Sequence, residues 1–550
     1  MRFSVLSAVA ALASLSHAAY SDPVDLLTDI NQIQRYWGQI SPYHDNPDDR
    51  FGVEYVGLPS GCQIESVHTL QRHAQRFQTS ANDDGELDQF FAQKLANYTS
   101  GMSTNKTGLF TGPLRFLNTY SYMLQDTGLL TGIGSLTEFQ SGVSFWNRYG
   151  RTIFNASVAQ LQYNASFPNG TARPPISLRT TSQSRIYNSM LGWALGFFGT
   201  SFQPVPDDTL ANFTSPFNVI VIPEGGTENN TLASYDSCAN DIVPDIGTIG
   251  DMDLFTYIPK YLGAATARLQ RYAPEGFKFT TNDTYAMQSI CAYEQAYIGQ
   301  SEFCTFFTAD EWAGFENTLD MEYYYDYSYG NPTGRAQGIG YVEELIARLT
   351  HEYIDSSDSA VNSTYDDNPT TFPLGQPFYA DFSHDDILVS VLTALSMDYF
   401  RDPPSLSQFP PNPNRHFILS DLTPFGARLI TEVIGCSVPD PAPAKASRVQ
   451  YTPTAYGYDP KNATSKFIRM RLNNGILPLN SIRGGACGNT TSGRVDGLCA
   501  LPNFLESQAT ASALSNYGFA CFGNYTLTNG TSGADYDGTV FANSSSIKLQ

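Results

Sequence analysis

Two arginines flank a histidine in the segment from Leu70 to Arg76, which reads Leu-Gln-Arg-His-Ala-Gln-Arg. A run of β-forming residues ends at Arg72-His73, so these side chains are expected where a strand ends. Burying two guanidinium groups beside an imidazole would be costly unless an anion compensated their charge. A neutral His73 could attack a phosphorus atom while Arg72 and Arg76 held the phosphate oxygens. The alternative is a strand end capped by surface charges, and these residues alone do not decide between the two.

A second strand–loop–helix pattern follows further along the chain. Ile176 to Arg179 is typical of a strand, Thr180-Thr181-Ser182 supplies capping residues, and apolar residues from Ile186 to Phe197 recur at helical spacing. Arg179 would then lie beside a helix N-terminus, where backbone N–H groups and the helix dipole favour an anion. An ordinary surface arginine is the alternative.

The third pattern comprises a strand from Phe378 to Phe382, the polar loop Ser383-His384-Asp385-Asp386, and a helix from Ile387 to Leu395. Ligands in α/β sheets bind where strands end. We therefore expect the loops of the three patterns to converge on one crevice. Further strands are expected at residues 417–419 and 466–472.

Hydrolysis of a phosphate monoester needs cations around a dianion, an in-line nucleophile and an acid that protonates the leaving alcohol. The three loops can supply all of these groups without a metal or another cofactor. His73 would be the nucleophile and would form a phosphohistidine that water then hydrolyses. Asp385 would protonate the leaving group, for which it must hold a proton, as low pH and a nearby phosphate favour. The phosphoryl oxygens would be held by Arg72, Arg76, Arg179 and His384.

The charge of the chain restricts its partners. The formal net charge of the 550 residues is −22 at pH 7. Such acidity argues against nucleic-acid binding, and it repels anionic substrates except where cations are concentrated. An acidic working pH would reduce this repulsion because carboxylates become protonated. The expected partner is a small phosphate ester, with neither a nucleic acid nor a membrane as partner.

Several features predict export. Residues 1–18 resemble a secretory signal with Arg2, an apolar run from Phe3 to Leu15 and the cleavage site Ser16-His17-Ala18. Fourteen Asn-x-Ser/Thr sequons indicate a glycosylated surface. The eight cysteines form no CxxC pair and no histidine cluster accompanies them, which favours disulfides over zinc. Their spacing leaves the connectivity open, although Cys291–Cys304 and Cys487–Cys499 are natural local loops. The protein is expected to be secreted.

The three patterns resemble signatures of the histidine acid phosphatase family, in the branch of fungal phytases and secreted acid phosphatases. Residues 70–76 resemble the Arg-His-Gly-x-Arg-x-Pro signature of the family, and residues 382–385 resemble its His-Asp signature. Residues 178–185 look like its intervening phosphate-binding arginine segment. Further likenesses lie at residues 323–330, 340–345 and 469–474, in the order of the family.

The resemblance implies an α/β fold: a central mixed sheet flanked by helices, phosphoglycerate-mutase-like, with a smaller inserted helical domain. It implies the roles given above for His73, Asp385, Arg72, Arg76, Arg179 and His384. It also suggests four disulfides, namely Cys62–Cys436, Cys238–Cys521, Cys291–Cys304 and Cys487–Cys499.

The predicted domain organisation has four parts. After the signal peptide at residues 1–18, residues 19–60 form an N-terminal arm, which could embrace a partner subunit in a homo-oligomer or pack on its own domain. Residues 61–220 and 340–550 form the α/β catalytic domain. Residues 221–339, rich in Tyr, Asp and Asn, form a mainly helical insertion.

The chain departs from the family pattern at three positions. Ala74 replaces the signature glycine, Gln78 replaces its proline, and Asp386 stands where fungal phytases usually have asparagine. The charged and imidazole positions are all retained, so the expected function is a secreted, metal-independent acid phosphomonoesterase, with phytate (inositol hexakisphosphate) as a candidate substrate. The alternative is a catalytically impaired secreted glycoprotein that keeps the fold as a binding module.

Overall fold

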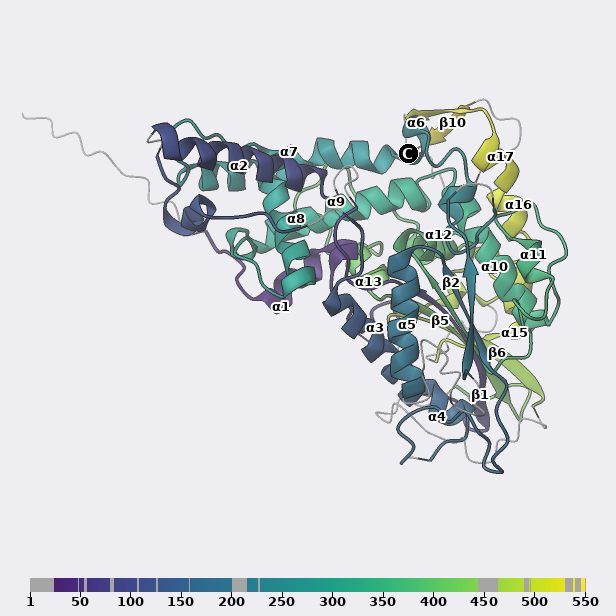
Figure 1. Cartoon of the computed structure of the whole chain (residues 1–550). Coiled ribbons are helices and arrows are strands. Elements are labelled where there is room, and N and C mark those ends of the chain that lie inside the picture. The colour runs from purple at the N-terminus through teal and green to yellow at the C-terminus, as the bar shows by residue number, and fades with distance from the viewer. Residues whose placement is uncertain are drawn as a thin grey trace, which may run out of the picture.

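A mixed β-sheet forms the core of the part of the molecule at the lower right of Figure 1. The computed structural model describes residues 24–549 except 48, 54–56, 80–83, 106–107, 125–126, 158, 200–214, 226–227, 444–462, 489–493, 495, 530–537 and 540–545. The strand order is β3-β2-β4-β1-β5-β6-β7, and β8 pairs with β6. The strands are β1 (Cys62–Arg72), β2 (Ile176–Thr181), β3 (Phe217–Ile222), β4 (Phe378–Ser383), β5 (Arg428–Cys436), β6 (Ser465–Leu472), β7 (Gly475–Ile476) and β8 (Cys499–Ala500). The predicted α/β fold with a central mixed sheet is confirmed.

The first four strands in the sheet order are parallel, and this arrangement places their carboxyl ends at one edge. β4 lies between β1 and β2, and β3 pairs with the far side of β2. Arg72, the last residue of β1, pairs with Ser383, the last residue of β4. β5 and β6 continue the sheet antiparallel to β1. The residues that follow β1, β2, β3 and β4 therefore meet at the same edge of the sheet.

Helices cover both faces of the sheet. On one face lie α3 (Gly132–Phe145) and α5 (Ser184–Phe198), whose apolar side chains pack on β2 and β4 around the fully buried Trp193. On the other face lie α10 (Gly334–Thr350) and α12 (Asp385–Ala394), which pack against each other. Strands buried on both faces contain nearly continuous apolar runs, and every residue of β2 and β4 is indeed buried.

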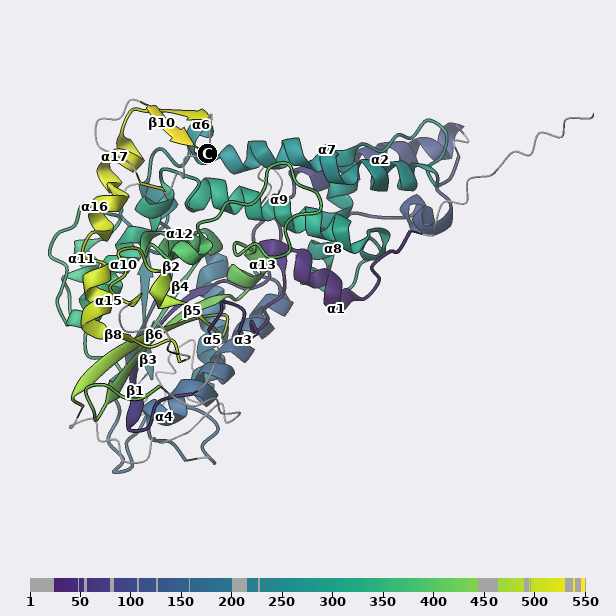
Figure 2. The same cartoon turned by 180° about the vertical axis from the view of Figure 1, so that it is seen from behind.

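A lobe of longer helices extends to one side of the sheet (Figures 1 and 2). It contains α2 (Glu86–Asn105), α7 (Ile249–Gln270), α8 (Thr281–Ile298) and α9 (Ala309–Tyr327). Capping boxes begin α8 and α9, where Thr280 pairs with Asp283 and Thr308 pairs with Glu311. Three of the four helices lie in the predicted insertion at 221–339, whereas α2 comes from an earlier part of the chain and packs on α8. The domain boundaries themselves stay a prediction.

The N-terminal arm packs on its own chain. It contains α1 (Ile30–Ile33), and its backbone is tied to the lobe by a hydrogen bond from Leu27 N–H to the carbonyl oxygen of Phe307 (2.9 Å). Trp37 is buried, with its ring 6.3 Å from that of Trp312 in α9. Of the two arrangements expected for the arm, the described part adopts the second. The homo-oligomer stays a prediction.

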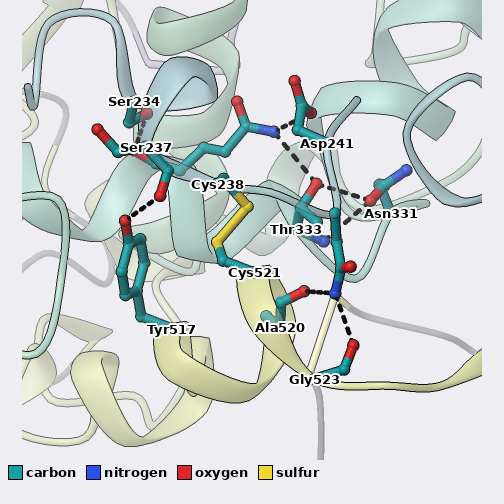
Figure 3. The surroundings of a disulfide bond; sticks show 12 residues. Ser234, Ser237, Cys238, Asp241, Asn331, Thr333, Tyr517, Ala520, Cys521 and Gly523 are labelled. Atoms are coloured by element: carbon teal, nitrogen blue, oxygen red, sulfur yellow. Dashed lines mark hydrogen bonds between the residues drawn. A yellow bond between two sulfur atoms is a disulfide. The ribbon is translucent and has the colours of Figure 1, made fainter. Parts of the chain in front are cut away.

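The four disulfides join the cysteine pairs that the family resemblance suggested: Cys62–Cys436, Cys238–Cys521, Cys291–Cys304 and Cys487–Cys499. Figure 3 shows the second of them, which fastens the C-terminal segment to the loop after β3. Beside it, the side-chain amide of Asn240 donates to the carbonyl oxygens of Ala520 (2.8 Å) and Gly523 (3.0 Å), and Tyr517 donates to that of Ser237 (2.7 Å). The loop after β3 is therefore held by residues near the end of the chain.

Short elements complete the fold. They are α4 (Arg151–Ile153), α6 (Pro244–Gly247), α11 (Ser363–Asp366), α13 (Leu419–Leu422), α15 (Leu501–Ser507), α16 (Ala511–Ser515), α17 (Tyr517–Phe522), β9 (Thr526–Asn529) and β10 (Ser546–Leu549).

Two local predictions had different outcomes, and one segment lies outside the described residues. Residues 417–419 do not form a strand but lead into α13, and β5 begins nine residues later. The strand at 466–472 is confirmed as β6. The predicted signal at 1–18 precedes the first described residue. Within the described residues, no helix is both long and apolar enough to cross a membrane.

Candidate active site

Two of the predicted loops meet at the carboxyl edge of the sheet. His73 follows β1 directly, and its backbone N–H donates to the carbonyl oxygen of Ser383 at the end of β4 (3.1 Å). His384 comes next and is the N-cap residue of α12, which begins at Asp385. One side-chain atom from each of His73, His384 and Asp385 lies within 4.8 Å of the others. All three residues are buried.

The imidazole of His73 is fixed with one nitrogen free. Nδ1 lies 2.8 Å from the carbonyl oxygen of Ala74, and because a carbonyl only accepts, Nδ1 carries the proton. Nε2 is buried and has no hydrogen-bond partner among the described residues. Burial lowers the pKa of His73 well below its ordinary value, and the positive charges of Arg72, Arg185 and Arg76 lower it further. The ring is therefore neutral, with its lone pair on Nε2.

Arg72 is held in place by two backbone carbonyl oxygens and by the carboxylate of Asp385. Its Nη1 atom donates to the carbonyl oxygens of Thr423 (2.6 Å) and Gln39. Its Nη2 atom lies 2.6 Å from Oδ2 of Asp385, and its guanidinium stands 4.6 Å from the ring centre of Phe425. A fully buried guanidinium held in this way keeps a fixed position.

Arg76 belongs to the same loop as His73, three residues further along the chain. Its Nη1 atom donates to Oδ2 of Asp84 and to the carbonyl oxygen of Phe77, both at 3.0 Å, and lies 3.4 Å from the hydroxyl of Tyr293. The same hydroxyl donates to the other carboxylate oxygen of Asp84. Asp84 thus anchors one end of the guanidinium.

Arg179 does not join the cluster, so its predicted phosphate contact is wrong in this structure. It lies inside β2, opposite Asp381 in β4. Its guanidinium makes two parallel bonds with Glu344 of α10 (2.8 and 2.9 Å) and lies 3.4 Å from Asp366. The side chain is 3 % exposed. Three carboxylates surround this buried cation, so Arg179 is a structural residue that ties β2 to the helices covering it.

Arg185 provides the third cation at the site. It belongs to the first turn of α5, immediately after the loop that follows β2. Its Nη2 atom lies 3.5 Å from Nδ1 of His384, and its charge is the second largest charge effect on the pKa of His73. The segment 178–185, which resembles the arginine segment of the family, contains both Arg179 and Arg185. In the folded protein Arg185, which lies beyond the end of β2, is the one that reaches the site.

Two further residues, which the sequence analysis missed, hold His384. Oε1 of Glu224, two residues beyond β3, lies 2.9 Å from Nε2 of His384. The hydroxyl of Tyr235 lies 3.1 Å from the same nitrogen and 3.1 Å from the other carboxylate oxygen of Glu224. Burial would raise the pKa of Glu224, but its hydrogen bond and charge interaction with His384 lower it overall, so Glu224 is ionised. The same strand-end rule that led to His73 could have found Glu224.

Asp385 is aimed at the cluster by a tyrosine. The hydroxyl of Tyr323 in α9 donates to Oδ2 of Asp385 (2.6 Å). Burial would raise the pKa of Asp385, but the charges of Arg72 and Arg76 lower it overall. The neighbouring Asp386 behaves in the opposite way, because burial raises its pKa to about 7, against the opposing charge of His384. The pKa values of these two adjacent carboxyl groups are therefore shifted in opposite directions.

The other two departures from the family pattern are accommodated by the packing. Ala74 is fully buried, and its backbone N–H lies 3.3 Å from the hydroxyl of Ser189 in α5. The side-chain amide of Gln78 donates to Asp88 of α2 (2.9 Å), which also accepts a hydrogen bond from Ser289 of α8 (2.9 Å). Gln78 therefore links the catalytic loop to the helical lobe.

The cluster of His73, His384 and Asp385 has the spacing of a metal site. Its surroundings do not favour a cation, because Arg72 and Arg185 already place positive charge beside both imidazoles. The same charges favour an anion with several acceptor oxygens. Metal independence stays a prediction.

The sequence places the chain in a family. Residues 63–473 match the histidine phosphatase superfamily (branch 2). The chain therefore belongs to that superfamily.

Within that superfamily, the chain is similar to several phytases. Phytase A of Aspergillus fumigatus is 28% identical to this chain over 493 residues, which cover 88% of this chain and 90% of that protein. A Phytase A of Aspergillus terreus is 30% identical over 414 residues, covering 74% and 80%. Among solved structures, the phytase from D. castellii superposes with a TM-score of 0.63 and 21% identity, over 92% of each chain. The protein is a phytase-like hydrolase of the histidine acid phosphatase type.

Proposed function

We propose that this enzyme hydrolyses phosphate monoesters through a phosphohistidine formed on Nε2 of His73. The observation that carries the proposal is the state of the imidazole. Nδ1–H is engaged by the carbonyl oxygen of Ala74, while Nε2 is buried, deprotonated and without a partner in the described part of the chain. A nucleophile of this kind needs no separate base.

The phosphoryl group would lie among the cations that surround His73. Arg72, Arg76 and Arg185 would bind its oxygens, and His384, held by Glu224, would lie beside it. Nε2 attacks phosphorus, the bond to the ester oxygen breaks, and the phosphoryl group is transferred to His73. Water then attacks phosphorus, which releases phosphate and restores the imidazole.

Asp385 would supply the proton to the leaving alcohol. In the structure without phosphate, its carboxylate is paired with Arg72 and Tyr323. A bound phosphate competes for Arg72 and adds negative charge nearby, and both effects raise the proton affinity of the carboxyl group. Once it has given up its proton, the same carboxylate can activate the water of the second step.

We infer that phytate is a substrate, because relatives of this chain are named phytase. It carries six phosphates, and the net charge of −22 would oppose its approach at neutral pH. Acidic pH reduces the charge on both partners. Secretion is supported by the predicted signal at residues 1–18, the sequons and the four disulfides. A secreted enzyme can meet acidic pH outside the cell.

The decisive experiment is phosphate release at about pH 5 in the presence of a chelator, from phytate and from p-nitrophenyl phosphate. Wild type should turn over both esters, and His73→Ala should lose nearly all activity while keeping the wild-type melting temperature. Full activity of the variant would refute the nucleophile. Turnover lost with the chelator would refute metal independence. A folded wild type that hydrolyses neither ester would support the binding module instead.

A further inference from the structure

A cavity adjoins the catalytic loop. Its volume is about 320 Å³, and it is lined by α3 and by residues of four other segments, among them Gln75 and Arg428. Gln75 lies two positions beyond His73, so the cavity and the catalytic site share one loop. A volume of this size holds a small ion together with several waters, since a water occupies about 30 Å³.

The side chain that distinguishes this cavity is Arg428, the first residue of β5. Arg428 is only 6% exposed, and its guanidinium lies 3.8 Å from the ring centre of Tyr43. Its Nε atom is buried without a hydrogen-bond partner. Throughout the described ranges, the guanidinium makes no hydrogen bond and no ion pair with a carboxylate. Burying a guanidinium without an anion costs free energy, so an anion bound in the cavity would stabilise Arg428.

The neighbouring charges do not neutralise Arg428. Arg148 also lines the cavity, but it is paired with Asp45 (3.0 Å), so these two cancel. Tyr43 donates to the same carboxylate (2.7 Å). Glu138 is a buried acid on which the charge of Arg428 acts, and burial raises its pKa to about 8 against that charge. Glu138 is therefore protonated at acidic pH, and the cavity keeps one net positive charge in a strongly acidic protein.

We propose that this cavity is a binding site for a phosphate group, separate from the site at His73. Arg428 would hold the phosphate oxygens with its free N–H groups, and hydroxyl and amide donors from Ser144 and Gln75 line the same space. The group is either free inorganic phosphate or one phosphate of a polyphosphorylated ester. Asp45, whose carboxylate is paired with Arg148, is the partly exposed acid of the lining.

Equilibrium dialysis with radiolabelled inorganic phosphate at about pH 5 tests the site without requiring turnover. Arg428→Gln should bind one phosphate fewer per chain than wild type. Ser144→Asp should do the same, because it places a carboxylate inside the cavity on a partly exposed position of α3. The matched control is Arg271→Gln, which removes the same charge from an exposed position elsewhere.

An Arg428→Gln variant that binds as many phosphates as wild type would overturn the proposal. If that variant does not fold, Ser144→Asp decides by the same count. The dialysis measures binding and does not depend on the phosphohistidine mechanism. If Arg428→Gln binds one phosphate fewer than wild type but wild type hydrolyses no ester, the proposed phosphate site is supported and only the proposed function is refuted.

Kinetics then separate the two sources of the phosphate group. If the site takes a phosphate of the substrate, Arg428→Gln should raise KM for phytate several-fold and leave KM for p-nitrophenyl phosphate unchanged. If it takes free phosphate, both KM values should stay and inhibition by added phosphate should weaken.

Discussion

Oε1 of Glu224 lies 2.9 Å from Nε2 of His384, and this contact crosses from the end of β3 to the end of β4. The carboxylate orients the imidazole, and Tyr235 completes the arrangement at 3.1 Å. Glu224 touches His384 rather than the phosphate, so it is a positioning residue.

Glu224→Gln should therefore lower kcat by roughly tenfold, equivalent to about 1.4 kcal/mol, because the amide keeps the shape but loses the charged hydrogen bond. Steady-state kinetics with p-nitrophenyl phosphate measure the loss. Glu224→Asp, which retains the charge on a shorter side chain, should recover part of it. Equal kcat in wild type and Glu224→Gln would show that the contact has no role in turnover.

Arg179 and Arg185 should respond in opposite ways to the same substitution. Arg185→Gln removes a cation beside His73 and His384, so kcat/KM should fall by about 100-fold or more with the melting temperature nearly unchanged. Arg179→Gln leaves Glu344 buried without its partner, which should destabilise the fold by about 3–5 kcal/mol. Urea unfolding and kinetics on both variants separate the roles. The assignment fails if Arg179→Gln proves the stable but inactive variant.

Asp385→Asn should distinguish substrates by their leaving groups. An alkyl phosphate or phytate needs a proton on the departing oxygen, whereas p-nitrophenolate leaves easily without one. The variant should therefore lose far more activity on phytate than on p-nitrophenyl phosphate. Equal losses on the two esters would exclude Asp385 as the general acid, and would point to its contact with Arg72 as the affected feature.

Asp386 should make the folded state less stable as pH rises. Its pKa is about 7 in the folded protein and about 3.8 when exposed, so the folded chain holds a proton that the unfolded chain releases between these values. The contribution of Asp386 to stability is therefore lost as pH rises from about 4 to about 7. Asp386→Asn should raise the free energy of unfolding at pH 7 by up to about 4 kcal/mol and leave it unchanged near pH 3.5.

Thermal melts at both pH values measure this difference. Asp245→Asn, at an exposed position, is the matched control and should change neither melt. A stabilisation that is equal at the two pH values would show that the effect of Asp386→Asn comes from packing and not from proton binding.

The strand–loop–helix pattern predicted most of the site, because parallel strands bring their carboxyl ends together. His73 and His384 lie in different patterns, more than 300 residues apart, and the fold places their ring centres 5.9 Å apart. The rule depends only on where strands end, and the sequence shows this through the change from apolar runs to polar residues.

The same rule failed where the last residue of a strand was misjudged. β2 continues to Thr181, so Arg179 lies inside the strand and faces Glu344, while Arg185 lies beyond the strand end. The sequence does not show which carboxylates a strand residue will meet, because Glu344 comes from a helix far along the chain. Glu224 was missed because β3 was not recognised as part of the sheet, although its run Phe-Asn-Val-Ile-Val-Ile has the composition of a strand.

The disulfide between Cys238 and Cys521 spans 283 residues and fastens the loop that carries Tyr235. On the ribosome, the segment around Cys521 emerges long after Tyr235 and Cys238. Until it does, the loop lacks the backbone anchors at Ala520 and Gly523 as well as the covalent bond. The support of His384 is therefore completed only after the segment around Cys521 has been synthesised, and a chain released before that point would contain His73 and Asp385 without a properly held His384.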